Sequence, residues 1–309
     1  MIMKSLYIFS LLLIFSACSG QQSKNTEKEQ TVERTFQMVE VPSMITEPDQ
    51  RADYLSVHYW DKFDFKDTAY IHLPEVTEQA FTNFIDILKY AAPEAVASAI
   101  KGMMNKADAD STMFAYFAGL YEKYLYDPNS PMRNEEFYIP ALQSIIASSS
   151  YDEVNKIRPQ HLLELALKNR AGESATDFTY TLANGKTGTL HGIKSDYLLL
   201  FFYNPDCHAC KEVTDQLTSS VTVKELVKNK KLKVLAVYPD EDLTAWKAHL
   251  SYMPAGWINS YDNSLSLKNE EIYDLKAIPT LYLLDKDKRV LLKDCAYPQL
   301  EDYLLQQNQ

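Results

Sequence analysis

Two cysteines three positions apart, in the stretch "NPDCHAC", are the residues of this sequence best suited to chemistry. Cys207 and Cys210 follow the apolar run "YLLLFFY", and the chain of 309 residues has only four cysteines. Such a pair can be a redox centre, half of a metal site, or two unreactive small residues in a core. The residues and elements around the pair bear on this choice.

A structural zinc site at this pair is poorly supported. It needs four ligands, which usually arrive as two cysteine pairs or as one pair with spaced histidines. This chain has one such pair, and His208 lies inside it, where both cysteines and this ring could not readily ligate one ion. Cys295 is alone in its region, and His249 has no second ligand nearby. We therefore expect neither a metal nor another cofactor.

The elements predicted around the pair supply a redox mechanism. A buried strand ends just before Cys207 and a helix begins there. The free N–H groups and dipole of a helix N-terminus lower the pKa of a thiol, and the thiolate is the nucleophile. Cys210, one turn on, faces the same side and can attack a mixed disulfide formed by Cys207. A protonated His208 would favour the thiolate and Asp206 would oppose it, so both are candidate redox-tuning residues.

After Gly172 the pattern is that of an α/β domain with a mixed sheet. The stretch "TDFTYTLANGKTGTL" predicts two short strands around an Asn-Gly turn. Buried strands are predicted at "DYLLLFFYN" and "KLKVLAVYP", with a helix from Cys207 to about Lys228 between them. Two helices, "EDLTAWKAHL" and "SLKNEEIYDL", should follow, then two strands in "TLYLLDKDKRVLLKD" and a closing helix in "PQLEDYLLQQ".

Residues 35–170 have a helical period and predict an all-α domain of four or five helices. Pro93 should end or kink one helix, and Asp110 should cap another. Apolar stripes run along these helices, and we expect them to be core rather than a binding groove. They contain Phe81, Phe84, Ile85, Leu88, Ala92, Met113, Tyr116, Phe117, Leu120, Tyr121, Tyr124 and Leu125. Three histidines without ligand-like spacing, at positions 58, 72 and 161, are expected to be structural or at the surface.

The N-terminus predicts export. Lys4 precedes an apolar stretch from Leu6 to about Ala17, which is too short to span a membrane. The following "FSAC" resembles the lipobox of bacterial lipoproteins, although Phe15 stands where an aliphatic residue is usual. This resemblance implies cleavage after residue 17, lipidation of Cys18 and attachment to a membrane by the lipid. The alternative is an ordinary cleaved signal peptide that takes Cys18 with it.

Composition limits the partners and the location. The formal net charge of −11 and pI of about 5.1 give no electrostatic footprint for nucleic acid, so we expect no nucleic acid partner. Residues 18–34 are polar and free of aromatic residues, as in a flexible tether. The expected location is the cell envelope, with the protein facing the periplasm, and Ser19 weakly favours the outer membrane. Disulfides can persist outside the cytoplasm.

Residues 172–309 resemble the TlpA/ResA-like branch of thioredoxin-fold thiol–disulfide oxidoreductases. The resemblance is carried by "ATDFTYTLANGKTGTL", "LLLFFYNPDCHACKEV", "VYPDEDLTAWKAHL", "WINSYD" and "YDLKAIPTLYLLDKDKRVLLKD". The helical half weakly resembles an uncharacterised domain that precedes thioredoxin-like domains in Bacteroidetes lipoproteins. The expected organisation is therefore a signal peptide (1–17), a tether (18–34), a helical domain (35–170) and an α/β thioredoxin-like domain (171–309).

The resemblance implies a role for each site residue. Cys207 would be the attacking thiol and Cys210 the resolving thiol, and the two would form a disulfide. Pro279 would follow a cis peptide bond next to the pair, and the backbone of Ile278 would pair with an extended substrate segment. The alternative for Pro279 is a trans proline that opens a strand.

The chain also departs from its relatives. Asp206 replaces an aromatic residue common before the first cysteine, and the buried aspartate of plain thioredoxin would align near Phe201. Leu200 and Asn204 stand where a peroxiredoxin needs proline and threonine, which argues against peroxidase activity. Cys295 is either a third redox thiol or a small apolar core residue, and the second is expected.

These expectations combine into one functional hypothesis and one alternative. The hypothesis is an extracytoplasmic thiol–disulfide oxidoreductase that exchanges disulfides with exported proteins. It would act as a reductant, resupplied by a membrane thiol-reductant carrier. The alternative is a lipoprotein binding or assembly module, in which the helical domain acts and the thioredoxin fold is a scaffold.

Overall fold

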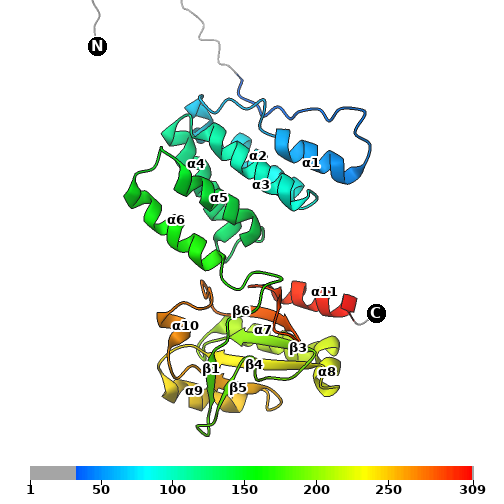
Figure 1. Ribbon diagram of the computed structural model, residues 1–309, viewed down its shortest axis with the longest axis vertical. Helices are drawn as coiled ribbons and strands as arrows, with labels where there is room; N and C mark the ends of the chain where they lie inside the picture. Colours follow the sequence, from blue (N-terminus) through cyan, green and yellow to red (C-terminus); the bar gives the residue numbers. More distant parts are fainter. Residues whose placement is uncertain (1–32, 308–309) are drawn as a thin grey trace, which may run out of the picture. The chain divides into compact units, whose positions relative to one another are not determined.

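The computed structural model describes residues 33–307 (Figure 1). The predicted signal peptide, Cys18 and nearly all of the tether lie outside these residues. Contacts place residues 36–307 in one unit, which contains both the helical region and the sheet region. Within the described residues, no helix is long and apolar enough to cross a membrane.

The helical region has six α-helices in the described part of the chain, more than the four or five predicted. The sequence patterns described above single out neither α1 nor α3. Helix α1 buries only Ala52 and Ser56 and so lacks an apolar stripe, and Pro93, expected to end or kink a helix, instead lies in the first turn of α3. Proline occupies the first turn of three of the helices, where its missing N–H costs no hydrogen bond. The helices are α1 (Pro48–His58), α2 (Pro74–Leu88), α3 (Pro93–Ala107), α4 (Ser111–Tyr121), α5 (Glu135–Ala147) and α6 (Glu153–Ala166), with a 3₁₀ turn η1 (Thr68–His72) and a π turn η2 (Glu122–Tyr126).

The apolar stripes of this region form a core, as the sequence predicts. Trp60 is buried at its centre and packs against the rings of Phe63, Phe84 and Phe117 in edge-on geometry. Most stripe residues are buried, while Tyr116 and Tyr124 are partly buried. Ala92 is exposed because α2 already ends at Leu88.

The C-terminal region is a mixed sheet of seven strands in the order β2-β1-β5-β4-β3-β6-β7. Strands β3, β4 and β5 are parallel, and the remaining pairings are antiparallel. This is the thioredoxin-like α/β arrangement that the sequence predicts. The strands are β1 (Thr179–Leu182), β2 (Thr187–Thr189), β3 (Tyr197–Phe202), β4 (Leu232–Tyr238), β5 (Ile258–Tyr261), β6 (Thr280–Asp285) and β7 (Val290–Leu292).

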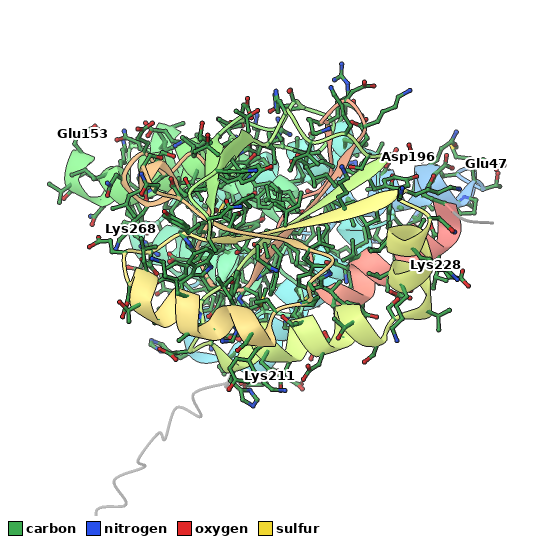
Figure 2. The ribbon with its side chains drawn as sticks, turned by 90° about the horizontal axis from the view of Figure 1, so that it is seen from below. Glu47, Glu153, Asp196, Lys211, Lys228 and Lys268 are labelled. Atoms are coloured by element: carbon green, nitrogen blue, oxygen red, sulfur yellow. A yellow bond between two sulfur atoms is a disulfide. The ribbon has the colours of Figure 1, made fainter. Side chains whose placement is uncertain are left out.

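Helices cover one face of the sheet. Alternate residues of β3, such as Leu199 and Phe201, pack against Leu217, Trp246 and Leu300 on this face. The covering elements are α7 (His208–Ser219), α8 (Val221–Lys228), α9 (Leu243–His249), the 3₁₀ turn η3 (Leu250–Tyr252) and α11 (Tyr297–Gln307). Lys211 lies on the outer side of this helical layer (Figure 2). The other face of β3 packs on residues from the first hairpin and from the segment before β6.

Two helix predictions in this region need correction. The helix expected from Cys207 to Lys228 is two helices, because Ser220 ends α7 and caps α8 by accepting the N–H of Val223 at 3.0 Å. The helix expected over "SLKNEEIYDL" is only α10 (Ser266–Asn269). It stops because Glu271 adopts a left-handed conformation with φ of 48°. Tyr273 is then buried against the sheet, and its hydroxyl donates to the carbonyl of Thr176 at 2.7 Å.

Candidate active site

The two cysteines lie where the central strand β3 passes into α7. Cys207 is the N-cap residue of α7, and its Sγ accepts a hydrogen bond from the N–H of Cys210 at 3.0 Å. The two residues are joined by a disulfide. In the reduced protein the same N–H and the α7 dipole would stabilise a Cys207 thiolate.

The two sulfur positions differ in access to solvent. Cys207 is partly exposed, whereas Cys210 is only 3% exposed and packs in the core beneath α7. A disulfide on another protein can therefore reach Cys207 but not Cys210. This asymmetry fits an attacking thiol at position 207 and a resolving thiol at position 210.

A loop distant in the sequence completes the site. The Ile278–Pro279 peptide bond is cis, and β6 begins at the next residue. The carbonyl oxygen of Ile278 lies 3.6 Å from Cys207 Sγ. The structure therefore brings together the four residues expected to act on substrate: Cys207, Cys210, Ile278 and Pro279.

Comparisons with known proteins agree with this geometry. A family model described as thioredoxin-like matches residues 195–290, and the Domain of unknown function (DUF5106) matches residues 17–169. A crystal structure of a thioredoxin-like protein from Bacteroides caccae is 50% identical, covers 88% of this chain and 98% of its own, and superposes with a TM-score of 0.85. The chain belongs to the thioredoxin-like family.

Two further solved structures match a part of this chain. The C-terminal domain of an uncharacterized protein from Bacteroides fragilis is 50% identical over 44% of this chain and 98% of its own, with a TM-score of 0.44. The thioredoxin domain of a thiol-disulfide oxidoreductase from Bacteroides vulgatus is 21% identical over 44% of this chain and 96% of its own, with a TM-score of 0.40. No curated protein matches the sequence.

The two candidate tuning residues of this thioredoxin-like protein both point to solvent. The His208 side chain is 86% exposed, and its Nδ1 lies 3.5 Å from a carboxylate oxygen of Glu212. Asp206 is exposed, and its backbone N–H donates to Asn204 Oδ1 at 3.3 Å. Water screens both groups from Cys207, so their effect on its thiolate should be modest.

A cavity beside the disulfide contains a histidine to which the sequence assigned no role. It has a volume of about 380 Å³ and is lined by Cys207, Cys210, Tyr203, His249 and Tyr252 among others. Burial lowers the pKa of His249, and the nearby Asp206 carboxylate raises it in part. His249 is 42 positions from Cys207 (249 − 207) and belongs to no motif, so only the fold reveals that it lines the site.

Phe201, near which the buried aspartate of plain thioredoxin is expected to align, has apolar surroundings. Phe201 is fully buried and stacks on Tyr203 with a centroid distance of 5.5 Å. The Tyr203 hydroxyl accepts a hydrogen bond from Trp246 Nε1 at 3.0 Å. Aromatic packing therefore fills the space behind the disulfide, and burial raises the pKa of Tyr203 to about 12.

Cys295 is a free and buried thiol between β7 and α11. Its backbone N–H donates to the carbonyl of Leu281 at 3.1 Å. Burial, aided by the negative charge of Asp294, raises the pKa of Cys295 to about 12. A thiol in this environment stays protonated at neutral pH, which fits a core residue.

Within the described residues, no group of three or more His, Cys, Asp or Glu side chains is arranged so that it could hold a metal ion.

Proposed function

We propose that this protein is an extracytoplasmic thiol–disulfide oxidoreductase of the TlpA/ResA-like kind that reduces disulfides of exported proteins. The observation that carries the proposal is the asymmetry of the pair. Cys207 Sγ is partly exposed, accepts a backbone N–H at 3.0 Å and lies 3.6 Å from the Ile278 carbonyl, whereas Cys210 is buried. An attacking thiolate, a substrate-binding backbone and a protected resolving thiol are thus assembled at one point.

The reaction follows from these positions. The thiolate of reduced Cys207 attacks one sulfur of a substrate disulfide, which forms a mixed disulfide and releases the other substrate sulfur as a thiolate. Cys210 gives up its proton and attacks Cys207 Sγ. This step forms the Cys207–Cys210 disulfide and releases the second substrate sulfur, so two electrons have passed to the substrate. The proposed membrane thiol-reductant carrier then returns two electrons to the pair.

Lipid anchoring at Cys18 and a periplasmic position at the outer membrane are parts of the same proposal. They rest on the lipobox-like "FSAC" and on the polar residues that follow it. Incorporation of a radiolabelled fatty acid into the native chain, but not into Cys18→Ala, is the expected result. Label that persists in the variant would contradict lipidation at this position.

Insulin reduction tests the proposed reaction. The mature chain should precipitate insulin chains in the presence of dithiothreitol, and Cys207→Ser should be inactive. Cys295→Ser is the matched control and should retain activity, because it removes a thiol that lies outside the Cys207–Cys210 pair. Equal rates for the native chain and Cys207→Ser would contradict the proposal. A reduction potential near that of thioredoxin would support the reducing direction, and one near that of strong oxidants would reverse it.

A further inference from the structure

The segment that leads into the cis-proline, residues 271–279, is held by the helical region. Lys168, just after α6, donates from Nζ to the carbonyl of Glu271 at 2.8 Å. The next residue, Asn169, donates from Nδ2 to the carbonyl of Ile272 at 2.7 Å, and its Oδ1 accepts the N–H of Thr176 at 2.7 Å. We call residues 271–279 the cis-proline segment.

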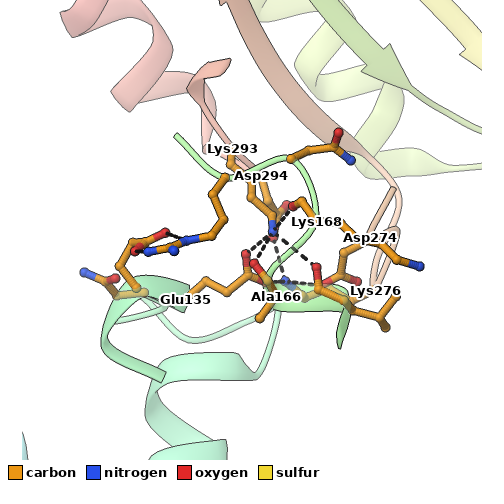
Figure 3. Close-up of polar contacts among 12 residues, drawn as sticks. Glu135, Ala166, Lys168, Asp274, Lys276, Lys293 and Asp294 are labelled. Atoms are coloured by element: carbon orange, nitrogen blue, oxygen red, sulfur yellow. Dashed lines mark hydrogen bonds and ion pairs between the residues drawn. The ribbon is translucent and has the colours of Figure 1, made fainter. Parts of the chain in front are cut away.

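Farther along this segment, Lys276 is almost completely buried in a cluster of charged groups (Figure 3). Its side chain is 4% exposed, and its Nζ lies 2.9 Å from Glu135 at the start of α5. Asp274 at 2.9 Å and Asp294 at 3.4 Å are its other carboxylate neighbours. The ring of Tyr126, also from the helical region, lies 5.1 Å from the same Nζ. The helical region thus supplies two of the groups that enclose Lys276.

A second lysine ties the same glutamate to the end of the sheet region. Lys293 Nζ lies 2.6 Å from Glu135 and donates to the carbonyls of Ala166 at 2.9 Å and Lys168 at 2.7 Å (Figure 3). These carbonyls are at the C-terminal end of α6, where a positive charge is favourable. The carboxylate of Glu135 therefore bridges two lysines of the sheet region.

The charges in this cluster balance. Lys276, Lys293 and Arg133 contribute +3, and Glu135, Asp274 and Asp294 contribute −3, so the sum is 3 − 3 = 0. Burial lowers the pKa of Lys276, but the three carboxylates outweigh it and raise the pKa above its ordinary value. Removal of one carboxylate would leave a buried lysine short of a partner, which is strongly unfavourable.

The cluster lies close to the redox chemistry along the chain. Lys276 is two residues before Ile278, whose carbonyl is 3.6 Å from Cys207 Sγ. Lys276 and Ile278 also line a cavity of about 370 Å³ together with His161 and Leu165 of α6. The helical region therefore contacts the cis-proline segment at Glu271, Ile272 and Lys276, and it lines a cavity together with Ile278, the residue expected to receive the substrate.

We infer that the helical region positions the cis-proline segment for substrate binding, through Glu135 of α5. This inference rests on the proposed oxidoreductase function and gives the helical region a part in it. Glu135 is a positioning residue, because it acts on Ile278 and Pro279 through Lys276 and does not touch the disulfide. The helical region is thereby a component of the substrate site and not a separate binding module.

A matched pair of variants, Glu135→Gln and Glu136→Gln, tests this inference in the mature chain. Both glutamates are in the first turn of α5, so each change removes one negative charge from the same helix N-terminus. Glu136 is 49% exposed and pairs with Arg170, so this pair lies within the helical region. Steady-state kinetics with insulin and with a small aromatic disulfide should be measured, together with the reduction potential of the pair.

For Glu135→Gln we expect KM for insulin to rise about tenfold, in line with loss of a charged hydrogen bond. The reduction potential and the rate with the small disulfide should stay unchanged, since Cys207 and α7 are untouched. Glu136→Gln should match the native chain in every measurement. Equal KM values for insulin in Glu135→Gln and Glu136→Gln would overturn the inference, even if both proteins are active.

A second measurement separates failure of this inference from failure of the proposed function. If the native chain does not reduce insulin, the proposed function fails. Hydrogen exchange in residues 271–282 then tests separately whether Glu135 holds the cis-proline segment in place. Exchange in that segment should be faster in Glu135→Gln than in Glu136→Gln, and equal exchange would overturn the inference. If Glu135→Gln does not fold, Lys168→Met takes its place, because it removes only the bond to the Glu271 carbonyl.

Discussion

The helical and thioredoxin-like regions have cores of a similar kind, but the sequence reveals their functions unequally. Both cores are rich in buried aromatic side chains, centred on Trp60 in the first and on Phe201, Tyr203 and Trp246 in the second. The second region also carries Cys207 and Cys210 as near neighbours in the sequence. Chemistry that depends on adjacent residues can be predicted from a motif. The part proposed for the helical region rests instead on its contacts with the other region.

The largest expected effect comes from truncating one buried ring in each of the two cores, which should lower the stability of the protein. Phe117→Ala in the helical core and Phe201→Ala in the sheet core should each lower the free energy of unfolding by about 3–5 kcal/mol, because both rings are fully buried. Tyr90→Ala is the control and should have little effect, since Tyr90 is 75% exposed. Denaturant titration followed by fluorescence and circular dichroism measures these changes.

The same variants show whether the two regions unfold together. If the ion cluster at Glu135 couples them, Phe117→Ala should shift one common transition that also reports on the sheet. Two separate transitions, with only the first shifted by Phe117→Ala, would show that the regions are independent. That result would also weaken the positioning role proposed for Glu135.

A smaller set of effects concerns the thiols of the thioredoxin-like region. Burial raises the pKa of Cys295 to about 12 from 9.0, so its thiolate fraction, and hence its alkylation at pH 8, should fall about a thousandfold. In the reduced native protein, iodoacetamide should label Cys207 and leave Cys295 unlabelled. Denatured protein, in which both thiols should react, is the control. Rapid labelling of native Cys295 would favour a third redox thiol.

The smallest predicted effect is the titration of His249 beside the disulfide. Burial lowers the pKa of His249 from its ordinary 6.5, and Asp206 partly offsets this, so Asp206→Asn should lower the pKa further. Because the folded-state pKa lies below the unfolded value, His249 contributes stability above pH 6.5 that is lost as the pH falls through the folded-state pKa. NMR titration of the ring measures the shift. An unchanged or higher pKa in Asp206→Asn would contradict this arrangement.

The sequence predicted the features that depend on local pattern. The strand before Cys207, the helix after it and the sheet strands follow from apolar runs and their periods. The cis bond at Pro279 followed from family resemblance, since no local property of "AIPT" distinguishes cis from trans. Two errors in the predicted helices also have local causes. Helix α1 was not predicted because it lacks an apolar stripe, and α10 is shorter than predicted because Glu271 adopts a left-handed conformation.

Features that depend on contacts between residues distant in the sequence could not be predicted from local patterns. Glu135 and Lys276 are 141 positions apart, and each reads alone as an ordinary surface charge. His249 was set aside as lacking a second ligand, although the fold places it in the cavity that contains Cys207. In both cases the surroundings of a charged or titratable side chain are set by the packing of elements distant in the sequence.

The proposed reaction depends most on Cys207 as the thiol that attacks substrate, and a trapped intermediate tests this directly. Reduced Cys210→Ser should be mixed with a disulfide-bonded protein substrate, quenched with acid and digested for mass spectrometry. Because a serine hydroxyl in place of the resolving thiol cannot attack the intermediate, a mixed disulfide between Cys207 and the substrate should accumulate. The absence of any adduct, or an adduct on Cys295 instead, would contradict the account.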